Sequence, residues 1–222
     1  MTWFRKKLSM AEMKETLPRT EVLHRGRIAV LDDEVPEMLK DLCDQGLAVS
    51  HLRSTDDPQF QALADGAYDL LLLDYGGIGP RFGHDEGLDV LRFLKRLNPG
   101  LRILAFTART FDASKADFFR LCDGVVKKDA GIRETLEQIE VHLSEVLTPS
   151  YQLAALTNAL GLSDEQQAEM EKVLSAVVVG KRDRSAAVQT AKRFAKGGSE
   201  KVLEALVGKA IELAIAHLTT AA

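Results

Sequence analysis

The sequence of 222 residues predicts an α/β fold with a doubly wound parallel sheet of five strands, followed by a smaller all-helical domain. One observation is the continuous apolar run at 70–73, which is typical of a strand buried on both faces of a parallel sheet. A second is the alternation of strand and helix patterns between residues 27 and 147, which favours helices on both faces of one sheet. Beyond Pro149, which ends the last helix of this region, only helical patterns remain.

The alternating region holds five strand patterns and five helix patterns. Right-handed crossovers between successive parallel strands give a layered sandwich, with the sheet between two layers of helices. The strands are expected at 27–31, 47–51, 69–74, 102–106 and 124–126. The helices are expected at 34–45, 57–65, 87–97, 113–121 and 131–147.

Two flanking regions carry helical periodicity without strands. Residues 1–25 form the first, a predicted helical extension that packs on the main domain or on a partner; its apolar positions are Trp3, Phe4, Leu8, Met13 and Leu17, before Pro18. The second is the domain 148–222, whose helices are expected at about 151–160, 163–179, 185–196 and 199–219. The predicted domains are therefore 1–25, 26–147 and 148–222.

The overall composition is that of a globular protein, with 45% hydrophobic and 28% charged residues. A formal net charge of -4 gives no general attraction to nucleic acid or to a membrane. No apolar run approaches membrane-spanning length, and the basic first residues lack the apolar stretch of a signal peptide, so we expect a cytoplasmic protein. Cys43 and Cys122 are expected to be reduced thiols in the core.

Polar side chains follow four of the predicted strands. Asp32 and Asp33 end one buried strand and Asp74 ends another, so the carboxyl edge of the sheet becomes rich in oxygen ligands. Such a pocket suits a hard divalent cation, and Asp74 is a candidate nucleophile beside it. Thr107 and Lys127 follow two further strands, where a hydroxyl and an ammonium group can bind phosphoryl oxygens.

This set of residues, in this order, resembles the receiver domain of two-component response regulators, a flavodoxin-like fold. The resemblance covers about residues 26–147 and rests on the segments 29–34, 71–74, 106–108 and 124–127. It implies that Asp74 accepts a phosphoryl group and that Mg²⁺ is bound by the acidic pair Asp32 and Asp33, by Asp74 and by the backbone carbonyl of Gly76. It also implies that Thr107 is the switch hydroxyl and Lys127 the lysine of the pocket.

The sequence departs from the family pattern at three places. The loop 75–87 is several residues longer than usual, and it is either a surface insertion or a source of pocket residues such as Arg81 or His84. Gly124 stands where the family usually has a switch aromatic residue. Lys127 is followed by Lys128 in place of the usual proline. Two adjacent lysines therefore compete for the lysine position of the pocket, and we assign it to Lys127.

The resemblance implies a phosphoacceptor signalling protein, and no enzymatic motif is seen in residues 148–222. The implied phosphodonor is a histidine kinase or a phosphotransfer protein, and the helical domain is expected to dimerise or to bind a protein partner. One alternative is a DNA-binding output with a helix-turn-helix-like domain, because basic residues gather at 181–196. A second alternative is a degenerate receiver that acts as a scaffold without phosphorylation.

Overall fold

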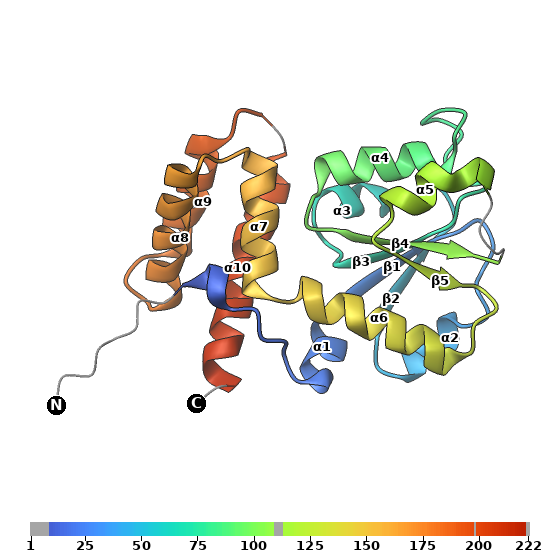
Figure 1. Cartoon of the computed structure of the whole chain (residues 1–222), viewed down its shortest axis with the longest axis horizontal. Coiled ribbons are helices and arrows are strands. Elements are labelled where there is room, and N and C mark those ends of the chain that lie inside the picture. The colour runs from blue at the N-terminus through green and yellow to red at the C-terminus, as the bar shows by residue number, and fades with distance from the viewer. Residues whose placement is uncertain (1–8, 109–112, 198, 221–222) are drawn as a thin grey trace. The chain divides into compact units, whose positions relative to one another are not determined.

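The computed structural model describes residues 9–108, 113–197 and 199–220 (Figure 1). The chain divides into two compact units, one formed by Leu17–Leu147 and the other by Thr148–Ala222 together with the residues up to Thr16. Residues 1–25, the expected N-terminal extension, thus contribute to both units, and the other boundary between the units falls between Leu147 and Thr148.

The sheet unit contains five strands, all paired in parallel, in the order β2-β1-β3-β4-β5. This is the flavodoxin-like order, in which the chain reverses direction across the sheet between β1 and β3. The predicted doubly wound fold is therefore confirmed. The strands are β1 (Arg27–Leu31), β2 (Ala48–Leu52), β3 (Leu70–Leu73), β4 (Arg102–Thr107) and β5 (Gly124–Lys127).

Helices cover both faces of this sheet (Figure 1). On one face lie α3 (Phe60–Ala64), α4 (Gly87–Leu97) and α5 (Ala116–Leu121), which follows the short 3-10 turn η2 (Ala113–Lys115). On the other face lie α2 (Leu39–Asp44), α6 (Ile132–Val146) and the additional helix α1 (Arg19–Arg25). All four leucines of β3 are fully buried, as expected for a central strand between two helical layers.

Helix α2 is shorter than expected, and the apolar spacing of α6 has a structural explanation. Helix α2 begins at Leu39 and not near residue 34, because Pro36 disfavours helical backbone at the residue before it. In α6, the apolar residues at heptad-like spacing include Ile139, Leu143 and Val146, which are all fully buried in the unit. The spacing in α6 therefore reflects packing in the core and leaves no seam for a coiled coil.

In its described residues, the second unit contains four α-helices, and two of them begin at side-chain caps. The side chain of Thr148 accepts a hydrogen bond from the backbone N–H of Tyr151, and Ser163 and Gln166 form a reciprocal capping box. Gly161 ends the first of these helices with a left-handed backbone (φ 58°), which glycine adopts without strain. The helices are α7 (Pro149–Leu160), α8 (Asp164–Val178), α9 (Arg184–Phe194) and α10 (Glu200–Thr220).

An N-terminal segment completes the core of the helical unit. Met10, in the 3-10 turn η1 (Met10–Glu12), is fully buried among residues of α7, α8 and α10. Next to it, the Ser9 hydroxyl donates a hydrogen bond to the Glu171 carboxylate (2.7 Å), and the His217 ring bonds to the backbone carbonyl of Glu15. No long helix precedes Pro18 in the described part of this segment; Trp3, Phe4 and Leu8 lie outside the described residues.

Helix α10 has apolar residues around much of its circumference, and the helical unit buries most of them. Most of its apolar residues are buried, and Ile215 and Leu218 are the large ones that stay exposed among the described residues.

The structure also corrects the expectation for the thiols, because Cys43 is exposed and Cys122 is half-buried. Partial burial raises the pKa of the Cys122 thiol to about 12, so this thiol stays protonated at neutral pH. No helix in the described parts of the chain is both long enough and apolar enough to cross a membrane.

We predict that Met10→Ala lowers the free energy of unfolding of the helical unit by about 2–4 kcal/mol, because it removes a fully buried side chain and leaves a cavity. Urea denaturation followed by far-UV circular dichroism measures this change. Glu12→Ala, an exposed position of the same turn, serves as the control and should change stability little. Equal stability of the two variants would contradict the placement of Met10 in the core.

Candidate functional site

The register of the sheet brings Asp32 and Asp74 together. Leu31 of β1 pairs with Leu73 of β3, so the next residue of each strand leaves the sheet at the same level. The backbone N–H of Asp74 donates to the carbonyl of Leu31 (3.0 Å), and that of Asp32 donates to the carbonyl of Leu52 (3.1 Å). These bonds continue the ladders by one residue and fix both carboxylates at the carboxyl edge of the sheet.

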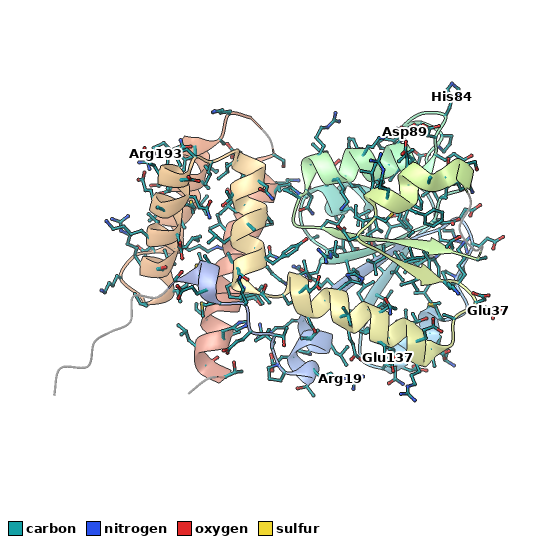
Figure 2. All side chains as sticks on the ribbon, viewed as in Figure 1. Arg19, Glu37, His84, Asp89, Glu137 and Arg193 are labelled. Atoms are coloured by element: carbon teal, nitrogen blue, oxygen red, sulfur yellow. The ribbon has the colours of Figure 1, made fainter. Side chains whose placement is uncertain are left out.

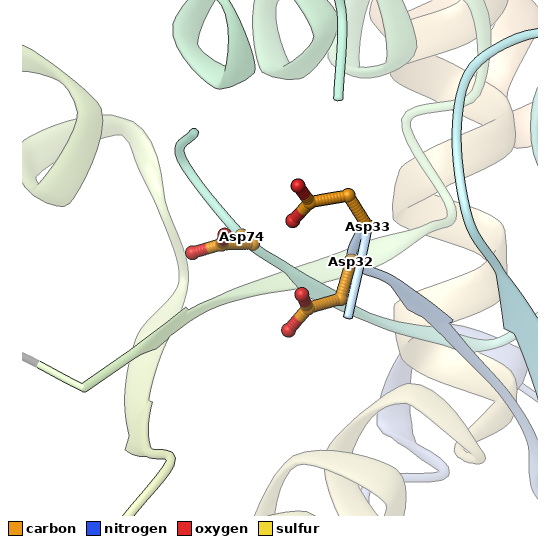
Figure 3. Close-up of side chains that lie close together, drawn as sticks. All are labelled: Asp32, Asp33 and Asp74. Carbon is orange, nitrogen blue, oxygen red and sulfur yellow. The ribbon is translucent and has the colours of Figure 1, made fainter. Parts of the chain in front are cut away.

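Three carboxylates share this edge (Figure 3). Asp32, Asp33 and Asp74 each offer a ligand atom, and these atoms all lie within 4.8 Å of one another. Asp32 is 1% exposed, so its negative charge needs a cation close by. Carboxylate oxygens in such a group are the ligands that Mg²⁺ prefers, and the donor set therefore fits a divalent cation.

The cation found in this cluster is Lys128. Its ammonium nitrogen lies 2.7 Å from an oxygen of Asp32 and 3.3 Å from an oxygen of Asp74. This corrects the assignment of Lys127, which is exposed as the last residue of β5. Side chains alternate between the two faces of a strand, so Lys128 continues the side of buried Val126 while Lys127 points the other way.

Charge and burial change the pKa values of this pair. Burial raises the pKa of the Asp74 carboxyl, and the neighbouring Lys128 charge opposes this without cancelling it. Burial lowers the pKa of Lys128, but the hydrogen bond to Asp32 and the charge of Asp74 outweigh it, so the pKa is above its usual value. Lys128 is therefore charged at neutral pH and partly compensates the carboxylates.

A pocket of ≈ 310 Å³ opens above the cluster. It contains the predicted residues Asp33, Asp74, Gly76 and Thr107, and Thr107 is held by the bond that its carbonyl accepts from the N–H of Lys128 (2.8 Å). Sequence reasoning missed part of the lining, since no family pattern or strand end marks Lys115 or the aromatic residues. The complete lining is Asp33, Glu34, Asp74, Tyr75, Gly76, Thr107, Ala108, Lys115, Phe119 and Lys128.

The long loop 75–87 is anchored away from the pocket by its own contacts. Ile78 is fully buried, and the Arg81 guanidinium bonds to the Asp56 carboxylate (2.8 Å) and packs over the rings of Phe60 and Phe82. His84 lies at the outer tip of the loop (Figure 2). Neither Arg81 nor His84 lines the pocket, so the interpretation of most of this loop as a surface insertion agrees with the structure.

The two ends of the loop do shape the site. Gly77 has a left-handed backbone (φ 73°), and a Cβ atom there would lie 2.6 Å from an oxygen of Asp33. The Gly77 N–H donates to the Glu86 carboxylate (2.8 Å), and Glu86 itself has a positive φ of 43°. A Cβ atom at Gly87 would lie 2.6 Å from the backbone oxygen of Asp74. Glycine at 77 and 87 therefore allows the loop to close tightly beside the carboxylates.

The corrected lysine register also moves the position of the switch aromatic residue. Gly124 lies three residues before Lys127, whereas Val125 lies three residues before Lys128. Neither residue is aromatic, so the position of the switch residue holds no ring in either register. Val125 is 43% exposed on β5. At Gly124 a Cβ atom would lie 2.5 Å from the His142 ring, so the space beside the glycine is already filled.

Solved structures similar to this chain are receiver domains of response regulators, and they cover about half of it. The receiver domain of NtrX from Brucella abortus is 22% identical, covers 52% of this chain and 97% of that one, and has a TM-score of 0.44. A CheY-like receiver domain from Methanospirillum hungatei JF-1 is 21% identical, covers 55% and 95%, and also has a TM-score of 0.44.

A two-component system response regulator/GGDEF domain protein is 17% identical to this chain, with a TM-score of 0.47. The matched region is 58% of this chain and 53% of that one, so this chain spans about half the length of that protein. The sequence matches no protein-family model and no curated protein sequence.

We predict that Lys128→Ala lowers the free energy of unfolding by roughly 1–3 kcal/mol without divalent cations, because it leaves Asp32 buried without its ammonium partner. The measurement is urea denaturation in the presence of a chelator. Lys127→Ala is the matched control and should change stability by no more than about 0.5 kcal/mol. A larger effect at Lys127 than at Lys128 would refute the corrected register.

Proposed function

We propose that this protein is a response regulator of a two-component or phosphorelay system, in which Asp74 accepts a phosphoryl group. The observation that carries the proposal is the convergence of Asp32, Asp33, Asp74, Thr107 and Lys128 at one edge of a sheet with the order β2-β1-β3-β4-β5. Each side chain reaches this edge from a different strand end, apart from the adjacent acidic pair, and each has a task in phosphoryl transfer.

The proposed reaction is a displacement at phosphorus. An oxygen of the Asp74 carboxylate attacks the phosphorus of a phosphohistidine, the new P–O bond forms, and the P–N bond breaks. The imidazole nitrogen leaves with the electron pair of that bond and takes up a proton from solvent water. The product is an aspartyl phosphate in the pocket, and no further reactant is needed.

The other residues of the pocket would bind and orient the phosphoryl group. Asp32, Asp33, Asp74 and the Gly76 carbonyl would hold Mg²⁺, which supplies positive charge to the phosphoryl oxygens when bound. The Lys128 ammonium offers a second positive charge, and the Thr107 hydroxyl offers a hydrogen bond. Once Asp74 carries the phosphoryl group, Lys128 gains a new oxygen partner, which changes the ion pairs at the ends of β1, β3 and β5.

The phosphodonor would be a histidine kinase or a phosphotransfer protein, and this protein would act in the cytoplasm. The protein would catalyse only its own phosphorylation and dephosphorylation, because the proposed nucleophile is one of its own side chains.

The helical unit would transmit the signal by dimerisation or by binding another protein. The DNA-binding alternative is less well supported, because part of the basic cluster is neutralised within the unit. Lys192 pairs with Glu200 (2.8 Å) and Glu204 (3.0 Å), and Arg193 pairs with Glu169. Cations held in this way are less available to bind DNA phosphates.

We expect acetyl phosphate with Mg²⁺ to phosphorylate the wild-type chain once, and Asp74→Asn to abolish the labelling while the fold is kept. An amide is a far weaker nucleophile than a carboxylate, which is the reason for the loss. Intact-mass spectrometry detects the added phosphoryl group, and circular dichroism checks the fold. Asp44→Asn, which changes an exposed carboxylate of α2, is the control and should be labelled as the wild type is.

Labelling of Asp74→Asn at the wild-type level would refute Asp74 as the acceptor. A wild-type chain that resists labelling with a folded pocket would instead support the scaffold without phosphorylation.

We further expect beryllofluoride with Mg²⁺, which mimics the phosphoryl group on Asp74, to shift the mass in solution from 24.4 kDa toward twice this value. Light scattering measures the mass, and Asp74→Asn should remove the shift. A constant dimer would make the helical unit a permanent interface, and a constant monomer would exclude phosphorylation-controlled dimerisation.

A further inference from the structure

We propose that Lys115 is a second phosphoryl-recognising cation, which binds the incoming dianionic phosphoryl donor at the mouth of the pocket and positions it for attack by Asp74. This inference rests on the proposed function, and it adds a residue that the family resemblance does not supply. Lys115 ends the turn η2 and lines the same pocket as Asp74, Thr107 and Lys128.

The position of the Lys115 ammonium is set by an aromatic platform. Its nitrogen lies 4.0 Å from the centre of the Tyr75 ring, a distance typical of a cation–π contact. Tyr75 directly follows Asp74 in the sequence, and both line this pocket, so the contact holds the ammonium at the wall of the pocket that contains the proposed nucleophile.

The platform itself is joined to the hydrophobic core. The Tyr75 ring meets Phe118 edge-on, with 5.2 Å between ring centres and 83° between planes, and Phe118 is fully buried. Phe119, which also lines the pocket, packs against Phe118 (5.6 Å). Tyr75 is therefore braced from behind, and Lys115 is held near the pocket at a smaller entropic cost than a lysine in solvent.

The two lysines of the pocket differ in what they already bind. Lys128 is engaged by Asp32 and Asp74 at 2.7 and 3.3 Å. Among the described residues, Lys115 has no carboxylate within ion-pair distance, and its ammonium lies against the ring face alone. The Lys115 charge is therefore available to an anion that enters the pocket.

The negative charge of the pocket explains what a second cation would do there. Asp32, Asp33, Glu34 and Asp74 together present four carboxylates, which repel a phosphoryl donor with two negative charges. One divalent cation and Lys128 offset part of this repulsion. An ammonium at the mouth reduces it further and raises the rate at which an anionic donor is captured. A protein phosphohistidine and a small acyl phosphate share the anionic chemistry that Lys115 would recognise.

The test compares Lys115→Gln, Lys115→Arg and Lys127→Ala in the full chain with acetyl phosphate and Mg²⁺. We expect Lys115→Gln to lower the second-order rate constant of labelling about five- to tenfold and to weaken its dependence on salt. Lys115→Arg, which keeps the charge, should restore most of the rate, and Lys127→Ala should behave as the wild type. Mg²⁺ affinity should be the same in all three variants, because Lys115 acts on the anion and not on the metal.

A second pair of variants tests the platform. Tyr75→Leu removes the ring and should lose about as much rate as Lys115→Gln, whereas Tyr75→Phe, which keeps the ring face, should recover most of that loss. Wild-type rate and salt dependence in Lys115→Gln would overturn the role of Lys115 while Asp74-dependent labelling still supported the proposed function. A folded wild-type chain that acetyl phosphate does not label would overturn both.

Discussion

The contact between the Lys128 ammonium and the carboxylates of Asp32 and Asp74 is the interaction on which the rest of the site depends. Two carboxylates fixed at neighbouring strand ends repel each other, and Asp32 is nearly removed from water. The pair persists because β5 delivers a cation to the same place. The ammonium thus stabilises the two carboxylates before any ligand binds. Its partners are the same groups that a divalent cation and a phosphoryl group would engage.

The sheet explains why these groups meet. Parallel pairing places every carboxyl end on one side, and the register of β1 with β3 sets two aspartates level with each other. Around this edge, the neighbouring elements are also held by contacts. The loop 75–87 is held by Ile78 and Arg81, and the Tyr75 ring is braced by Phe118. The result is a preformed pocket, whose walls are part of the core.

The sequence predicted a parallel sheet of five strands with acidic residues and Thr107 at its carboxyl edge, because continuous apolar runs and strand ends leave a clear pattern. It did not settle which of two adjacent lysines enters the pocket. That choice depends on the side of β5 that faces inward, which two adjacent valines do not reveal; in the structure Val126 is buried, whereas Val125 and Lys127 are exposed. The place of Lys115 in the pocket could not be predicted from the sequence. Its contact with Tyr75 joins residues 40 positions apart, through a turn that has no sequence signature.

The buried turn at Met10 has a consequence for the order in which the chain folds during synthesis. Residues up to Thr16 belong to the helical unit, Leu17–Leu147 form the sheet unit, and the chain re-enters the helical unit at Thr148. The sheet unit can close once its last helix has left the ribosome, whereas the segment around Met10 waits for α7, α8 and α10. At about 5–20 residues per second, the 131 residues from 17 to 147 take roughly 7–26 seconds to make. During that time the side chains of Met10 and Met13 lack their native partners, and they are exposed to chaperones, to proteases and to other nascent chains.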